Sequence, residues 1–165
     1  MPHTHTGYAA ETFIDELLER AGKDPVAGRL ALLSDHPRMA GVLRRVAEIS
    51  DWSSAPAAGR ARGVAVVHSF GTWVAQVAEV SVDAAGEPRV HKVWCAVDCG
   101  RVVNPDIVVA QMESGIGYGL GAALYDEITL EPGGTVRQSN FHDYRSLRIN
   151  EMPEIVVDIL ASQEH

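Results

Sequence analysis

Cysteine is scarce in this sequence, which holds Cys95 and Cys99 among its 165 residues and no other. Four positions apart on an extended strand, two residues lie about 13 Å from one another, and that distance excludes a disulfide between them. No second Cys or Cys/His pair completes a zinc site at the usual spacing. We therefore expect two buried thiols and no metal.

Positive charge is also in the minority. The chain has 14 Lys and Arg residues against 22 Asp and Glu, a formal net charge of −8 and a pI near 5.3. Binding of nucleic-acid phosphates needs a concentrated basic surface. The small clusters at Arg44–Arg45 and at Arg60 and Arg62 are interpreted as solvated faces, so no nucleic-acid partner is expected.

The sequence has no apolar signal region at its start and no uninterrupted apolar run of membrane-spanning length. Gly115 and Gly119 have the spacing of a membrane-helix dimer motif. Asp106, Gln111 and Glu113 interrupt that segment, so we expect no membrane span. The compartment, cytoplasmic or periplasmic, stays open.

Several enzyme motifs are missing: the G-x-S-x-G elbow, the P-loop and H-E-x-x-H. The G-x-G-x-x-A run from Gly117 fits a relaxed dinucleotide fingerprint, but its glycines are expected well inside a helix instead of between a strand and a helix. His68, Ser69 and Asp98 could form a catalytic triad on paper, yet nothing in their spacing supports one. We expect no catalytic residue in this chain.

Residues 1–52 are predicted to be a helical segment. Residues 1–7 are interpreted as a polar end in which His3 and His5 are exposed and bind no metal. Apolar periodicity then predicts helices over 9–21, 25–33 and 37–49. In the first of these, an acidic solvated face is expected opposite an apolar stripe. The acidic residues are Glu11, Asp15 and Glu16, and the stripe is Phe13, Ile14, Leu17, Leu18 and Ala21.

Residues 60–165 are predicted to combine strands with one long helix. Val-rich runs with period-two alternation at 63–70, 72–83 and 89–98 indicate an antiparallel meander. In the third run, one side carries Val93, Cys95 and Val97 and the other carries Trp94 and Ala96. Further strands are expected at 126–130, 136–138 and 154–160. The fold class is α+β, with N-terminal helices followed by an antiparallel sheet packed against a Gly-rich helix.

The Gly-rich helix is predicted over residues 105–124, beginning at Asn104-Pro105-Asp106. Each of its four glycines costs about 1 kcal/mol relative to Ala, so something must approach the helix closely. Helical spacing places Gln111 on one face together with Gly115, Tyr118, Gly119 and Ala122. Gln111 is then either a satisfied polar residue in helix-on-sheet packing or a contact to a bound cofactor.

The run VDCGRVVNPDIVVAQMESGIGYGLGAALYDEITL carries a family resemblance, which extends through Gln138–Val157 and back through His3–Leu33. It resembles the C-terminal portion of the molybdopterin-binding large subunit of the xanthine dehydrogenase/aldehyde oxidase family, of the isoquinoline 1-oxidoreductase beta-subunit type. The resemblance implies a molybdenum hydroxylase that oxidises aldehydes or N-heterocycles. It also implies a molybdopterin cofactor, expected in its cytosine dinucleotide form, and iron–sulfur clusters in a small partner subunit.

By this resemblance, Gln111 matches the glutamine that hydrogen-bonds the pterin, and it is the one cofactor-binding residue we carry over. Asp98, Gly100 and Asn104-Pro105 match a turn and helix start that aim Gln111. The segment His142-Asp143-Tyr144 matches a motif to which we assign a loop-anchoring role.

The family's catalytic glutamate lies in a G-x-G-E-P motif, and Glu164 lacks that glycine context. The G-Q-G cofactor loops are also missing from the chain. We therefore expect residues 1–52 and 60–165 to form together one part of a molybdopterin-binding domain, inactive alone and prone to self-association. Its partner would be the remainder of the large subunit or a split-chain partner. The alternative is a non-catalytic assembly or interaction module that retains the family fold.

Overall fold

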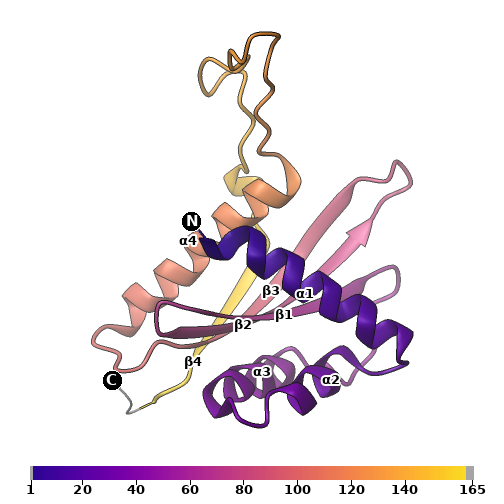
Figure 1. The fold of residues 1–165 in the computed structure, drawn as a ribbon, viewed down its shortest axis with the longest axis vertical. Helices are drawn as coiled ribbons and strands as arrows, with labels where there is room; N and C mark the ends of the chain where they lie inside the picture. The colour runs from indigo at the N-terminus through magenta and orange to yellow at the C-terminus, as the bar shows by residue number, and fades with distance from the viewer. Residues whose placement is uncertain (1, 163–165) are drawn as a thin grey trace.

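The computed structural model describes residues 2–162, which form helices around one sheet (Figure 1). The elements in chain order are α1 (Pro2–Arg20), α2 (Pro25–Leu32), α3 (Pro37–Ile49), β1 (Ala61–Ser69), β2 (Thr72–Val82), β3 (Pro88–Asp98), α4 (Pro105–Leu124), the short 3-10 helix η1 (Ile149–Glu151) and β4 (Glu154–Ile159). The α+β class is as predicted.

The sheet has the order β1-β2-β3-β4, and its first three strands form the predicted antiparallel meander. The fourth strand differs from the expectation, because β4 pairs with β3 in parallel and makes the sheet mixed. A parallel pair needs a long crossover connection, usually a helix, and α4 lies within that connection. The periodicity of a single strand does not reveal the direction of its neighbour.

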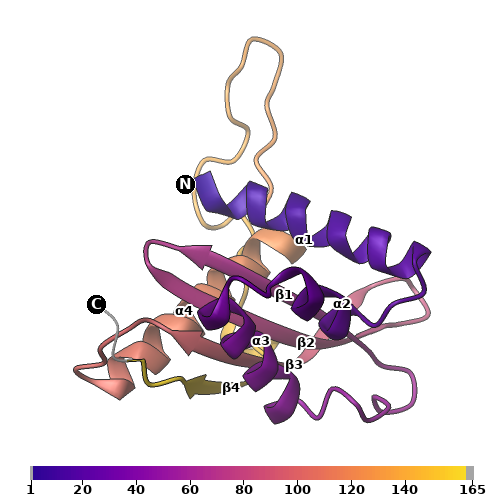
Figure 2. The ribbon, with the colours of Figure 1, turned by 60° about the horizontal axis from the view of Figure 1, so that its bottom comes forward.

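Helices cover both faces of the sheet. On one face α3 buries Val42, Leu43 and Val46 against the sheet residues Val64, Val66, Ala75, Val77, Trp94 and Ala96. On the other face Ile116 of α4 packs with Val93 and Cys95. The predicted alternation along β3 is therefore confirmed. Figure 2 shows α2 and α3 on one side of the sheet and α4 crossing the other.

The first helix is longer than predicted, because α1 begins at Pro2 although residues 1–7 were expected to be an untied end. A single glycine, here Gly7, costs only about 1 kcal/mol in a helix. Gly7 also lies close to Val67 of β1, since a Cβ added to Gly7 would be 3.5 Å from Val67 Cγ2. His3 and His5 fall on this helix. Among the described residues, no group of three or more His, Cys, Asp or Glu side chains could hold a metal ion.

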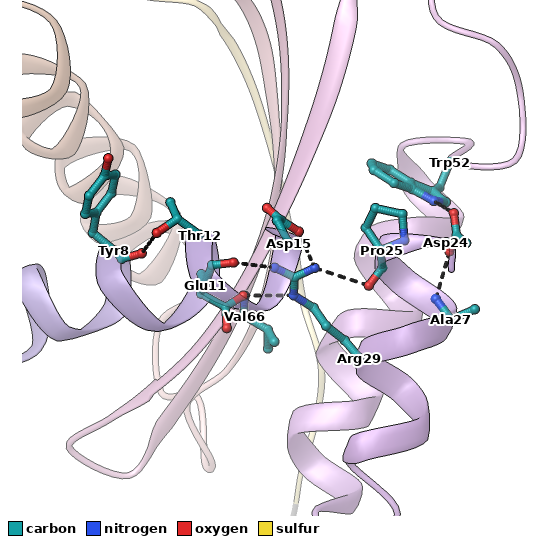
Figure 3. Close-up of polar contacts among 10 residues, drawn as sticks. All are labelled: Tyr8, Glu11, Thr12, Asp15, Asp24, Pro25, Ala27, Arg29, Trp52 and Val66. Atoms are coloured by element: carbon teal, nitrogen blue, oxygen red, sulfur yellow. Dashed lines mark hydrogen bonds and ion pairs between the residues drawn. The ribbon is translucent and has the colours of Figure 1, made fainter. Parts of the chain in front are cut away.

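The two faces predicted for α1 are wrong in part. Leu18 is buried, but Phe13 and Leu17 are exposed. The acidic side instead carries a buried ion-pair cluster around Arg29 of α2, whose side chain is 2% exposed (Figure 3). Its Nε donates to Glu11 Oε2 at 3.0 Å and its Nη1 to Asp15 Oδ1 at 2.6 Å. Glu16 is exposed as expected.

This Arg29 cluster joins three elements. The guanidinium also donates to the backbone carbonyl oxygens of Glu11 and Pro25. Glu11 Oε2 in turn accepts from the backbone N–H of Val66 at 2.9 Å, on the outer side of β1. The cluster thus fastens α1 to α2 and to the edge of the sheet.

Residues 126–148, called the arm below, extend away from the sheet and its helices (Figures 1 and 2). We expected strands at 126–130 and 136–138, but the arm contains one isolated bridge, Leu130 with Val136. The turn at 132–134 does close a hairpin. Because an isolated two-stranded hairpin is marginal without a face to pack on, the ladder does not extend.

Among the described residues, α4 is the one helix whose length and composition would allow it to cross a membrane. This differs from our expectation that its polar residues exclude a span. In this fold one side of α4 is occupied by the sheet, through Ile116 together with Met112 and Leu120. That contact accounts for part of the apolar character of the helix.

Candidate cofactor-binding site

The site begins with a buried carboxylate where β3 ends. Asp98 accepts from Arg38 Nε at 2.8 Å, from Ser162 Oγ at 2.7 Å and from the backbone N–H of Gly100 at 3.1 Å. The Arg38 guanidinium, together with the hydrogen bonds from Ser162 and Gly100, outweighs the effect of burial and lowers the pKa of Asp98 to about 2. Gly100 adopts φ +77°, a conformation that favours glycine.

The start of α4 follows this turn. The side chain of Asn104 accepts from the backbone N–H of Asp106 at 3.0 Å, and Pro105 stands at the first helical position. The predicted turn and helix start are both confirmed. Local rules were sufficient here, because cap residues act on backbone groups two or three positions away.

Gln111 lies on the side of α4 that the sheet leaves open. The residues predicted to share its face are Gln111, Gly115, Tyr118, Gly119 and Ala122, and all five are exposed. Helix-on-sheet packing involves the other side, through Ile116. Gln111 therefore takes no part in helix-on-sheet packing, which was one of its two interpretations, and the residue is exposed at the surface of the chain.

The four glycines of α4 divide into two pairs. A Cβ on Gly117 would meet Met152 at 3.5 Å, and one on Gly121 would meet the Asp126 carboxylate at 3.1 Å. These two are explained by close approach within the chain. A Cβ on Gly115 or Gly119 would have nothing within 4 Å, so the chain itself does not require glycine beside Gln111.

The other sequence candidates are placed apart from this face. The His68 ring stacks on Trp73 with centroids 4.4 Å apart, and Arg38 covers the same ring at 3.8 Å. Because the Asp98 carboxylate is engaged by Arg38, Ser162 and Gly100, it does not complete a triad with His68 and Ser69. The stack joins β1, β2 and α3, and no local sequence signal could have identified it.

The loop-anchoring role expected for His142-Asp143-Tyr144 is confirmed for Asp143. Its carboxylate accepts from the backbone N–H groups of Ser139 and Asn140 and from Ser139 Oγ. The Asn140 and Ser139 N–H groups lower the pKa of Asp143 to about 2. Glu164, which we did not assign to catalysis, lies outside the described residues.

The two thiols differ in burial. Cys95 is fully buried against α4, and this burial raises its pKa to about 11. Cys99 is only half-buried, in the turn after β3, so the expectation of two buried thiols is wrong for Cys99. Both are free, as predicted.

Comparison with known proteins identifies the family. Residues 41–153 match the model of the molybdopterin cofactor-binding domain, which spans more than half of the chain. The chain belongs to this family. The matched region contains α4 with Gln111 and most of the sheet on which α4 packs.

Two relatives of the chain carry the names of oxidoreductases. The chain is 42% identical to isoquinoline 1-oxidoreductase subunit beta of Brevundimonas diminuta over 95% of its length, and covers 20% of that protein. It is 33% identical to membrane-bound aldehyde dehydrogenase [pyrroloquinoline-quinone] of Gluconacetobacter polyoxogenes over 96% of its length, and covers 23% of that protein.

A solved structure shares the fold. Quinoline 2-oxidoreductase from Pseudomonas putida 86 superposes with a TM-score of 0.53 at 26% sequence identity. The match covers 55% of this chain and 12% of that one. The chain thus spans about a fifth of the length of the curated relatives it matches, and the family resemblance read from the sequence is confirmed.

Proposed function

We propose that this chain forms part of the large subunit of a molybdenum hydroxylase and that the exposed Gln111 face of α4 contacts the pterin of its molybdopterin cofactor. The observation that carries the proposal is the open amide of Gln111 within a molybdopterin cofactor-binding domain. Membership of the family supports the cofactor class, and the exposure of Gln111 supports the residue.

The residues on this face fit a flat, polar ring system. A glutamine amide offers both a donor and an acceptor, which suits the alternating nitrogen and oxygen atoms at the edge of a pterin. Gly115 and Gly119 leave the backbone beside Gln111 uncovered, so a ring could approach the helix closely. Packing within the chain does not explain why Gly115 and Gly119 are glycines. Close approach of a bound ring to the helix backbone would explain both.

The cofactor would supply the oxidation chemistry, a molybdenum-centred hydroxylation of a carbon in an aldehyde or N-heterocycle. This chain would bind and orient the pterin through Gln111, held in place by the Asp98 turn and the Asn104 cap. We extend the proposal to the cytosine dinucleotide form of the cofactor, and to a small subunit whose iron–sulfur clusters accept the electrons.

The two open glycines give a prediction with opposite signs. Gly115→Ala and Gly119→Ala are each expected to raise the free energy of unfolding of the isolated chain by about 1 kcal/mol, because alanine favours a helix and the added Cβ meets nothing. In a complete subunit the same changes are expected to lower the bound pterin content. Urea unfolding and pterin analysis measure the two effects. A loss of stability in the isolated chain would contradict this view of the face.

The test of the proposed function uses a chimeric subunit. In it, this chain replaces the matching segment of the Brevundimonas diminuta isoquinoline 1-oxidoreductase subunit beta, which it aligns with over 161 residues. After expression with the small subunit in a host that makes molybdenum cofactor, we expect stoichiometric molybdenum and pterin, and dye reduction by isoquinoline. A folded chimera that binds a quinone in place of molybdenum, or binds neither, would contradict the proposal.

A further inference from the structure

The arm has internal order despite its distance from the sheet and helices. The backbone N–H of Thr129 donates to Gln138 Oε1 at 2.9 Å, and Gln138 Nε2 donates back to Thr129 Oγ1 at 3.1 Å. After the hairpin, the Asp143 carboxylate accepts from the backbone N–H groups of Ser139 and Asn140. Hydrogen bonds therefore set the shape of the arm before any partner arrives.

The base of the arm is fixed to α4 and η1. The Arg145 guanidinium lies 3.8 Å from the centre of the Tyr125 ring, directly after α4, and its Nη2 donates to Glu151 at 2.6 Å. Glu151 also accepts from the backbone N–H of Arg148. These contacts fix the direction in which the arm extends from the end of α4 (Figure 1).

The arm presents large apolar side chains to solvent. Four of them, with exposed fractions from 46% to 73%, are Ile128, Leu130, Val136 and Phe141. Two charged side chains of the arm are partners, since Arg137 Nε lies 3.9 Å from Glu131 Oε1. A partner surface would therefore meet hydrocarbon and partly neutralised charges.

We propose that the arm is a clasp, buried in the complete protein against another part of the same large subunit. Apolar surface of this kind is typical of permanent interfaces, which resemble a divided core, and less of transient ones. Curated relatives that align along almost the whole chain are about five times longer, and their additional length supplies such a partner surface. This inference rests on the proposed membership of a large subunit but not on cofactor binding.

The test compares two pairs of substitutions in two settings. The arm pair is Ile128→Ser with Leu130→Ser, at side chains 55% and 64% exposed. The control pair is Leu32→Ser with Val82→Ser, at side chains 65% and 64% exposed outside the arm. In the isolated chain, both pairs are expected to change the urea midpoint little and to a similar extent, because more than half of the surface of each side chain is already exposed to water.

In the chimeric subunit, made without molybdenum cofactor, the arm pair is expected to raise the unfolded fraction at a fixed urea concentration by about 30-fold or more, and the control pair by less than about threefold. Amide exchange at residues 128–136 is also expected to be at least tenfold slower in the chimera than in the isolated chain.

The proposal would be overturned by equal effects of both pairs, by unprotected arm amides, or by a chimera that fails to fold with the unaltered arm. Protection of the arm in a dimer of the isolated chain would identify a second copy as its partner and would also overturn it.

Because neither measurement needs the cofactor, the clasp and the proposed function can fail separately. If the arm amides are protected from exchange in a chimera that binds no molybdenum, the clasp proposal is supported and the proposed enzyme function is contradicted. If the chimera binds molybdenum and the arm amides exchange freely, only the clasp proposal is contradicted.

Discussion

Arg29→Met is expected to lower the free energy of unfolding by about 3–5 kcal/mol, the usual effect of removing one partner from a buried ion pair. The Arg29 side chain is 2% exposed and neutralises Glu11, which is itself 12% exposed. Methionine would fill part of the volume but donate no hydrogen bond. The Glu11 carboxylate and the backbone carbonyls of Glu11 and Pro25 would each lose the hydrogen bond that Arg29 donates, and Glu11 would keep only its bond from the Val66 backbone.

Arg44→Met is the matched control, because Arg44 is exposed on α3. It is expected to change stability by less than about 0.5 kcal/mol. Urea denaturation followed by circular dichroism measures both variants. If Arg29→Met unfolds at the same urea concentration as Arg44→Met, the cluster does not fasten α1 to the sheet in the way described.

Asp98→Asn is expected to destabilise the fold by about 3 kcal/mol at neutral pH, because it leaves the Arg38 charge without its carboxylate partner. The pKa of Asp98 in the fold is about 2, below the ordinary 3.8. The stabilisation from the carboxylate is therefore complete above pH 3.8 and is lost as the pH falls toward 2. That shift corresponds to about 2 kcal/mol.

The difference in stability between the unaltered chain and Asp98→Asn should accordingly narrow by about 2 kcal/mol between pH 4 and pH 2. Unfolding curves for both chains across this range provide the measurement, and all other acidic groups cancel in the comparison. A difference that stays constant with pH would show that Asp98 is not held as the charged partner of Arg38.

Features governed by neighbouring residues were predictable from the sequence. Asp24 caps α2 through the backbone N–H of Ala27, and Asn104 caps α4, because capping depends on residues a few positions apart. The alternation along β3 also follows the local period of 2. Each of these patterns occurs within one element and was correctly interpreted without a partner.

Features that depend on distant residues were not predictable in the same way. Glu11 and Arg29 are 18 positions apart and belong to different helices, so an acidic helix face looked solvated. The parallel pairing of β4 depends on the route of α4 and on the β3 residues 62 positions upstream, such as Lys92 opposite Glu154. The sequence also did not decide which face of α4 packs on the sheet. Glycine spacing alone does not show that Gly117 and Gly121 have close neighbours in the chain whereas Gly115 and Gly119 have none.

For the candidate site, the sequence proposes one residue, and its cofactor-binding role stays a prediction. The resemblance singled out Gln111, and the structure adds that its amide is exposed next to two open glycines. The Arg38–Trp73–His68 stack behind the Asp98 turn had no sequence signal. Its members come from the three elements α3, β1 and β2, so no spacing within one element brings them together.

The central claim is that Gln111 holds the pterin, and the most direct measurement is pterin and molybdenum retained by the chimeric subunit with Gln111→Ala. Loss of the hydrogen bonds between the Gln111 amide and the pterin is expected to weaken cofactor binding by about tenfold. Glu113→Ala, also exposed on α4, serves as the control. The account predicts cofactor loss on dialysis for Gln111→Ala and retention for Glu113→Ala. Equal retention by both variants would contradict it.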